Sequence, residues 1–168
     1  QSDKNETNPA FLQNGEKIAF LSNESGSSQV WIMNTDGSER KQLSHESKDI
    51  SGFAFSPDER KVILIMEVPS TSSIQANDAD LPKATGMVIN DLMYKHWDQY
   101  VKSIPHPFIA DFSENQITQT YDILAGEPYE CPMLPFGDIE QLAWSPDSKF
   151  IAYTCRKKVG KDYAISTD

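Results

Sequence analysis

Length, composition and charge set the first limits on this protein. The chain has 168 residues, of which 38% are hydrophobic and 24% charged, a balance typical of a globular protein. Fifteen basic and 25 acidic residues give a net charge of -10, which would repel a phosphate backbone, so we expect no nucleic-acid partner. No apolar run approaches the roughly 18 to 20 residues that cross a bilayer, so we predict no membrane span.

One local pattern occurs three times along the chain. Each copy has an aromatic residue, then a turn, then an apolar run rich in β-branched and aromatic residues, which favours a strand. In two copies the turn contains Pro, which presets φ for the first central turn position, and Asp, which hydrogen-bonds the local backbone. Each copy therefore predicts a β-hairpin. The copies lie at residues 11–20, 55–64 and 144–153.

The residues after the first copy predict a complete antiparallel sheet. A second apolar run lies at 29–33, an Asp-Gly pair typical of a tight turn follows it, and 40–43 has the pattern of a short, polar outer strand. Phe11 and Phe55 are 44 residues apart, which lies within the ~40 to 45 residues of one propeller blade. We predict a first blade over about 8–45.

The second and third copies predict two further blades, the first of which carries an insertion. Residues 107–112 and 117–124 resemble the third and fourth strands of a blade, whereas the stretch before them lacks the repeat pattern. The third blade reaches its third strand at 163–167, so we expect the parent polypeptide to continue beyond Asp168. Because the first residue is Gln1 rather than Met, we also expect the parent polypeptide to begin before it. The fold class is therefore all-β, a partial β-propeller of about three four-stranded blades in one domain. The predicted boundaries are 1–168 for the domain, 50–125 for the second blade, 67–105 for its insertion and 139–168 for the incomplete third blade.

The insertion carries a helical pattern. Its apolar residues recur at helical spacing, which predicts one amphipathic helix near residues 90–102 that ends before Pro105 and Pro107. Such a helix would either narrow access to the propeller mouth or only cover the edge of the blade. The apolar positions are Ile89, Leu92, Met93, Trp97, Tyr100 and Val101.

The repeat resembles a known family. The aromatic-Ser-Pro-Asp turns at 55–58 and 144–147, together with 29–37 and 42–43 of the first unit, resemble the WD40-like repeat of TolB and of prolyl oligopeptidase family propellers. Residues 91–100 resemble a segment of the dipeptidyl peptidase 5 and acylaminoacyl peptidase branch. This resemblance implies a periplasmic or secreted serine peptidase as the parent. It also implies a further part of the propeller and a C-terminal α/β-hydrolase domain as the partner of this segment.

Irregular sequence is concentrated on one predicted face of the propeller. In an up-and-down blade the Ser-Pro-Asp turns share a face, while the insertion and the connection 126–137 share the opposite face. Long connections on a repetitive fold are where recognition usually occurs, so this side either faces the substrate and the hydrolase domain or provides additional packing. The substrate-facing candidates are Trp97, Glu127, Tyr129 and Glu130.

The two glutamates have two interpretations. An aminopeptidase needs negative charge to hold the protonated α-amine of its peptide substrate, and Glu127 and Glu130 could supply that charge. Alternatively, they are ordinary solvated charges of a loop. Cys131 and Cys155 could pair in an oxidising compartment, although two thiols in a chain of this size are more often unpaired and buried.

The sequence contains no complete catalytic apparatus. No Gly-x-Ser-x-Gly elbow is present, so we expect this chain alone to hydrolyse no peptide and predict no catalytic residue in it. His45, His96 and His106 lack metal-ligand spacing, and no Gly-rich phosphate loop occurs, so we predict neither a metal nor a cofactor.

These features of the sequence bear on three possible functions. The favoured one is the propeller segment of a serine exopeptidase, which gates substrate access and helps to orient the peptide N-terminus. The alternative is a TolB-like protein-binding propeller without an enzyme domain. A propeller lyase would need clustered histidines and metal ligands, which the chain does not offer. Because a partial propeller leaves sheet faces uncovered at its ends, we also expect self-association of the isolated segment.

Overall fold

The structure is a computed structural model. It describes residues 4–70, 74–75, 88–89, 95–96, 99–134, 136–155 and 157. The regular structure of these residues consists of β-strands and two single-turn 3₁₀ helices, η1 (Gln13–Gly15) and η2 (Ile139–Gln141). Within this part of the chain, no helix has the length and apolarity needed to cross a bilayer.

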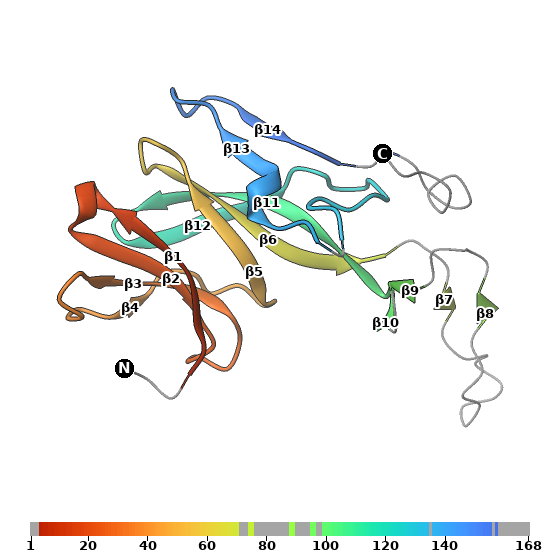
Figure 1. The fold of residues 1–168 in the computed structure, drawn as a ribbon, viewed down its shortest axis with the longest axis horizontal. Coiled ribbons are helices and arrows are strands. Elements are labelled where there is room, and N and C mark those ends of the chain that lie inside the picture. Colours follow the sequence, from red (N-terminus) through yellow and green to blue (C-terminus); the bar gives the residue numbers. More distant parts are fainter. Residues whose placement is uncertain are drawn as a thin grey trace.

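The first sheet is a four-stranded antiparallel meander in which each strand pairs with its neighbour in sequence (Figure 1). It has the four strands that the sequence predicted for a first blade. The strands are β1 (Glu6–Leu12), β2 (Lys17–Ser22), β3 (Gln29–Asn34) and β4 (Lys41–Gln42).

The second sheet is also four-stranded, although its strands are not contiguous in sequence. Its order is β12-β11-β6-β5, and the insertion leaves from the end of β6 and returns at the start of β11 (Figure 1). The third and fourth strands therefore follow the insertion, as predicted. The strands are β5 (Ile50–Phe55), β6 (Lys61–Pro69), β11 (Ser103–Ser113) and β12 (Gln116–Asp122).

The third unit begins with a hairpin of β13 (Leu142–Trp144) and β14 (Ile151–Tyr153). Its predicted third strand at 163–167 lies outside the described residues. The predicted fold class, an all-β chain of propeller-type sheets, is confirmed, whereas the exact domain boundaries stay a prediction.

The helix predicted near 90–102 is wrong for the described residues of the insertion. There, β9 (Lys95–His96) pairs antiparallel with β10 (Gln99–Tyr100), and β7 (Ile74–Gln75) pairs with β8 (Val88–Ile89). A helix of about 12 residues has only marginal stability unless its apolar face packs against other residues, and aromatic residues also favour strands. Pairing of short strands is therefore the more stable local arrangement.

Strand β6 has apolar side chains buried on both of its faces. Val62, Leu64 and Met66 face the first sheet and belong to the core between the two sheets. Ile63 and Ile65 point the other way, into a second core that includes Leu142 of the third hairpin. Because successive strand residues point to opposite faces, only a strand between two packed layers carries such an unbroken apolar run.

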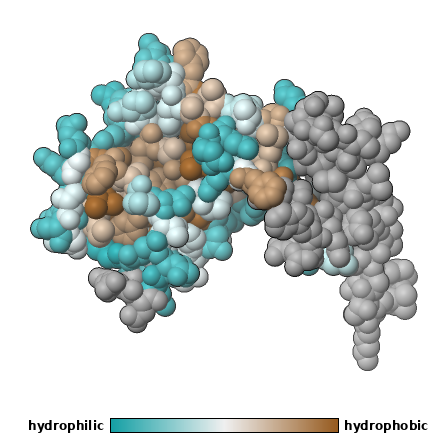
Figure 2. Space-filling model, in the orientation of Figure 1, coloured by the Kyte–Doolittle hydropathy of each residue, from teal (hydrophilic) through white to brown (hydrophobic). Residues whose placement is uncertain are grey.

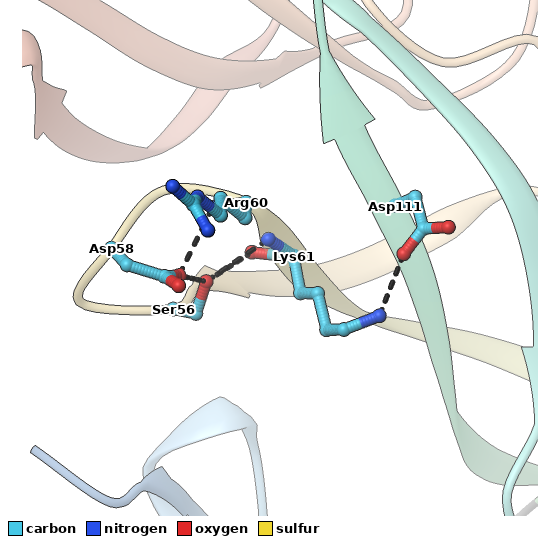
Figure 3. A network of polar contacts seen from close by, with 5 residues as sticks. All are labelled: Ser56, Asp58, Arg60, Lys61 and Asp111. Atoms are coloured by element: carbon cyan, nitrogen blue, oxygen red, sulfur yellow. Dashed lines mark hydrogen bonds and ion pairs between the residues drawn. The ribbon is translucent and has the colours of Figure 1, made fainter. Parts of the chain in front are cut away.

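The turn between β5 and β6 is held by the side chains that the repeat specifies. The Ser56 hydroxyl donates to Asp58 Oδ1 at 2.7 Å and accepts from the Lys61 backbone N–H at 3.0 Å (Figure 3). The Arg60 N–H also donates to Asp58 Oδ1, at 3.1 Å. These hydrogen bonds, the one from Ser56 most of all, hold the pKa of Asp58 below its ordinary value.

Equivalent turns of the three units share their backbone conformation and contact one another. The fourth residue after each repeat aromatic has a positive φ, of 90° at Gly15, 54° at Glu59 and 59° at Ser148. The Gln13 N–H donates to Glu59 Oε1 at 2.8 Å, and the Asp58 N–H donates to Ser148 Oγ at 3.0 Å. The three turns thus gather on one face, as predicted, and lie together at one end of the molecule in Figure 1.

The aromatic residues of the repeat differ in burial, and the one in the first unit is the most exposed. Phe55 packs edge-on against Phe112 at 4.9 Å, and the Trp144 indole N–H donates to the Ala54 carbonyl of β5 at 3.0 Å. Phe11, in the first sheet, is 73% exposed. Apolar side chains gather at the surface over β1 and β2 in Figure 2, which marks a sheet face that no described residues cover.

Alanine substitutions in β6 test the burial of its two faces. We expect Leu64→Ala and Ile65→Ala each to lower the free energy of unfolding of the propeller by about 2 to 5 kcal/mol, because each leaves a cavity in a different core. Denaturant unfolding of the parent polypeptide, followed by tryptophan fluorescence, measures this loss. The exposed Glu67→Ala on the same strand is the control and should change stability by less than about 0.5 kcal/mol. A neutral Ile65→Ala would contradict packing of the third hairpin on β6.

The Ser-Pro-Asp turn has a pH dependence of defined sign. Because the folded pKa of Asp58 lies below the ordinary value of 3.8, its stabilisation is present above pH 3.8 and is lost as the pH falls through the folded pKa. We expect Asp58→Asn, whose amide oxygen still accepts from Ser56 but does not titrate, to lose less stability than the wild type between about pH 6 and about pH 3. Urea unfolding at both pH values measures the difference, and equal losses would contradict it.

Candidate functional site: the anchored loop after the second sheet

The candidate residues of the long connection lie in a loop whose two ends are both hydrogen-bonded to β11. We call residues 124–130 the anchored loop. On one side of it, the Ile123 N–H donates to the Pro107 carbonyl at 3.2 Å, and on the other the Cys131 N–H donates to the Pro105 carbonyl at 2.9 Å. The loop therefore leaves from and returns to neighbouring points of one strand.

Two prolines make this anchoring compatible with the sheet. The N–H and C=O of a strand residue point to the same side, so the missing N–H groups of Pro105 and Pro107 lie on the loop side. Pairing of β11 with β6 consequently continues without interruption through Pro105↔Glu67 and Pro107↔Ile65. The carbonyls of both prolines remain available for the loop.

A buried histidine and an aspartate fix the start of the anchored loop. The His106 side chain is 2% exposed, and its Nδ1 lies 2.9 Å from Asp122 Oδ2. The other oxygen, Asp122 Oδ1, accepts from the Leu124 N–H at 2.8 Å. Among the described residues, no group is hydrogen-bonded to His106 Nε2. Because a carboxylate only accepts, Nδ1 carries the proton of this contact, and the aspartate joins β11 to the first loop residue.

The candidate side chains of the loop differ in exposure. Glu127 is exposed, whereas Tyr129 is 8% and Glu130 only 3% exposed. The interpretation of both glutamates as solvated loop charges is therefore wrong for Glu130. Burial raises the pKa of Tyr129, and the nearby Glu127 carboxylate raises it further. The Lys157 ammonium lies 5.9 Å from the Tyr129 ring centroid.

The fourth predicted candidate, Trp97, lies outside the described residues. Conversely, sequence reasoning passed over His106 and Asp122, because no spacing motif joins a histidine of one strand to an aspartate at the end of the next. The only local signal was a histidine between two prolines.

The second half of the connection returns the chain to the third unit. The Met133 N–H donates to Gln141 Oε1 at 2.8 Å, and the Gly137 N–H donates to the Met133 carbonyl at 2.8 Å. A Cβ at Gly137 would overlap that carbonyl oxygen and the Gln141 amide, so the turn needs glycine. The connection therefore ends in a tight structure that leads directly into η2 and β13.

The arrangement is suited to binding and positioning. The anchored loop and the end of β14 lie on the side opposite the Ser-Pro-Asp turns, as the alternation of connections predicted (Figure 1). In the described part of the chain, no three His, Cys, Asp or Glu side chains are grouped to hold a metal ion. The loop contains an exposed glutamate, Glu127, close to the Tyr129 side chain, and a buried one, Glu130.

A double-mutant cycle tests the histidine-aspartate contact. We expect His106→Ala, Asp122→Ala and the double variant to give a coupling energy of about 1 to 3 kcal/mol in unfolding experiments, because the histidine is buried and hydrogen-bonded to the largely shielded aspartate. The matched control is Lys149 with Asp147, whose side chains are 73% and 52% exposed and whose coupling should be near zero. Equal couplings for the two pairs would contradict the anchoring role.

Comparison with known proteins places the chain. No protein-family model matches it. It is 50% identical over 167 residues to dipeptidyl-peptidase 5 of Porphyromonas gingivalis, which covers 99% of this chain and 24% of that protein. It is 38% identical over 160 residues to dipeptidyl-peptidase 5 of Porphyromonas endodontalis, covering 95% of this chain and 23% of that one.

Among solved structures, a protein from Agrobacterium tumefaciens described as TolB matches 92% of this chain and 44% of that protein's chain, with a TM-score of 0.51. The two sequences are 19% identical, so this likeness shows the fold alone. The chain spans about a quarter of the length of the curated relatives it matches. Over nearly its whole length, the chain is therefore a homologue of a segment of dipeptidyl-peptidase 5, and it has a TolB-like propeller fold.

Proposed function

We propose that this chain is the non-catalytic propeller segment of a serine exopeptidase of the dipeptidyl-peptidase 5 type. The observation that carries the proposal is the 50% identity over 99% of the chain to a protein of that name, of which the chain spans only 24%. These 168 residues contain no Gly-x-Ser-x-Gly elbow, which supports a catalytic nucleophile elsewhere in the parent polypeptide. The proposed setting is the periplasm or the exterior of the cell.

The proposed role is to limit substrate access by size. Such a role needs sheets that keep a fixed relative position, and several contacts between the first two sheets support it. The Ile117 N–H of β12 donates to the Leu43 carbonyl at 3.0 Å, and the Thr120 hydroxyl donates to Glu46 Oε1 at 2.6 Å. Together with the core between the sheets, these contacts make a rigid wall that would admit short or unfolded peptides and exclude folded ones.

The second part of the role is to orient the peptide N-terminus. We propose that the anchored loop presents a carboxylate to the protonated α-amine of the substrate. Its two ends are fixed to β11, so the loop can hold a charge at a defined position, which a binding site requires. Glu127 is the carboxylate that reaches solvent, whereas the buried Glu130 requires that the substrate approach closely.

The TolB-like alternative has less support. The TolB structure is 19% identical to this chain and carries information on the fold only. The identity to dipeptidyl-peptidase 5 of Porphyromonas gingivalis, 50%, is more than twice as high and covers a slightly larger part of the chain.

Charge removal in the loop tests the proposal. In the parent polypeptide, we expect Glu127→Gln or Glu130→Gln to raise KM for free-amine dipeptide substrates about tenfold, the effect of losing about 1.4 kcal/mol of binding. The KM of the same variants for N-acylated substrates should not change, because these lack the charge. Steady-state kinetics measures both. Glu114→Gln, an exposed carboxylate in the turn on the opposite face, is the control. Unchanged KM values in both loop variants would overturn the orienting role.

A further inference from the structure

The two cysteines of the chain share one apolar cluster, to which residues of the third hairpin also belong. Cys131 follows the anchored loop and is fully buried, and Cys155 lies two residues after β14 and is half-buried. Cys155 packs against the same cluster to which Cys131 belongs. Both are free thiols in this structure. Chain segments 24 residues apart in sequence thus place two thiols in one cluster.

The two thiols differ in reactivity. Burial, and to a smaller extent the charge of the neighbouring Cys155, raises the pKa of the Cys131 thiol to about 12. At neutral pH Cys131 is therefore protonated, and its burial shields it from reagents in solution. Cys155 is more accessible, so an external reagent would reach it first.

We propose that Cys131 and Cys155 are an oxidation site at which a disulfide joins the anchored loop to the third hairpin. This inference does not depend on the proposed function. The cross-link would attach the return point of the loop, where the Cys131 N–H is bound to β11, to the chain just after β14. It would therefore fix the third unit to the second by a covalent bond in addition to the Trp144 contact with Ala54.

The reaction proceeds in two exchange steps with a small-molecule disulfide such as oxidised glutathione. First, the Cys155 thiolate attacks one sulfur of the reagent, so that a mixed disulfide forms and one glutathione thiolate leaves. Second, the Cys131 thiolate attacks Cys155 Sγ, forms the protein disulfide and releases the second glutathione. Two protein thiols are oxidised and one glutathione disulfide is reduced to two thiols, with both protein protons passing to the glutathione products.

The sequence allows direct mapping of the product. Trypsin cleaves after Lys102, Lys149 and Arg156, which places Cys131 in peptide 103–149 and Cys155 in peptide 150–156. We expect the folded parent polypeptide, treated with oxidised glutathione and then alkylated, to yield these two peptides joined by a disulfide. Mass spectrometry with and without reductant identifies the pair.

Two variants and the pH dependence test the order of events. Cys131→Ser should retain glutathione on Cys155, because the second step is blocked, whereas Cys155→Ser should leave Cys131 unmodified in the folded protein. The closing step should accelerate about tenfold per pH unit from pH 7 to 9, since the Cys131 thiolate fraction rises in that proportion below a pKa of about 12. Persistent glutathione on Cys155 in the wild type, with no joined peptides, would overturn the proposal.

Discussion

The burial of β6 on both faces is the constraint on which the rest of the structure depends. Four consecutive residues, from Val62 to Ile65, are each at most 1% exposed, and their side chains alternate between two cores. Each contributes roughly 1.5 to 3 kcal/mol relative to exposure, so this strand can be stable only with a packed layer on either side. The first sheet supplies one layer, and the third hairpin with its preceding connection supplies the other.

The connections at the two opposite ends of the strands are built differently. At one end, short turns of similar conformation bond to each other through Gln13, Glu59, Asp58 and Ser148. At the other, the anchored loop is attached through proline carbonyls and the contact between His106 and Asp122. Repetition of one turn gives the first end little variety, whereas the long connection allows side chains of different kinds to be positioned at the second.

This division agrees with the role proposed for the segment. A rigid wall with one elaborated end suits a component that admits and orients peptides without reacting with them. The same end holds Cys131 and Cys155, so oxidation would act on the loop that carries Glu127 and Glu130. The anchoring contacts and the disulfide would both reduce the freedom of that loop, one through hydrogen bonds and the other covalently.

Local sequence determined much of the fold. The repeated turns and the apolar runs that follow them each act over a few residues, so the sheets and the shared face of the turns could be predicted. The helix expected near 90–102 failed because an apolar spacing of few turns is weak, and pairing of Lys95–His96 with Gln99–Tyr100 competes with it.

Only the tertiary structure decided how the residues of the candidate site are held and buried. No local pattern predicts the contact between His106 and Asp122 or the burial of Glu130. The same holds for the cluster that Cys131 and Cys155 share. Each depends on how the connection folds back onto β11, and that path is set by contacts between residues far apart in sequence. The sequence by itself therefore determined the repeated units, and packing between them determined which side chains lie together.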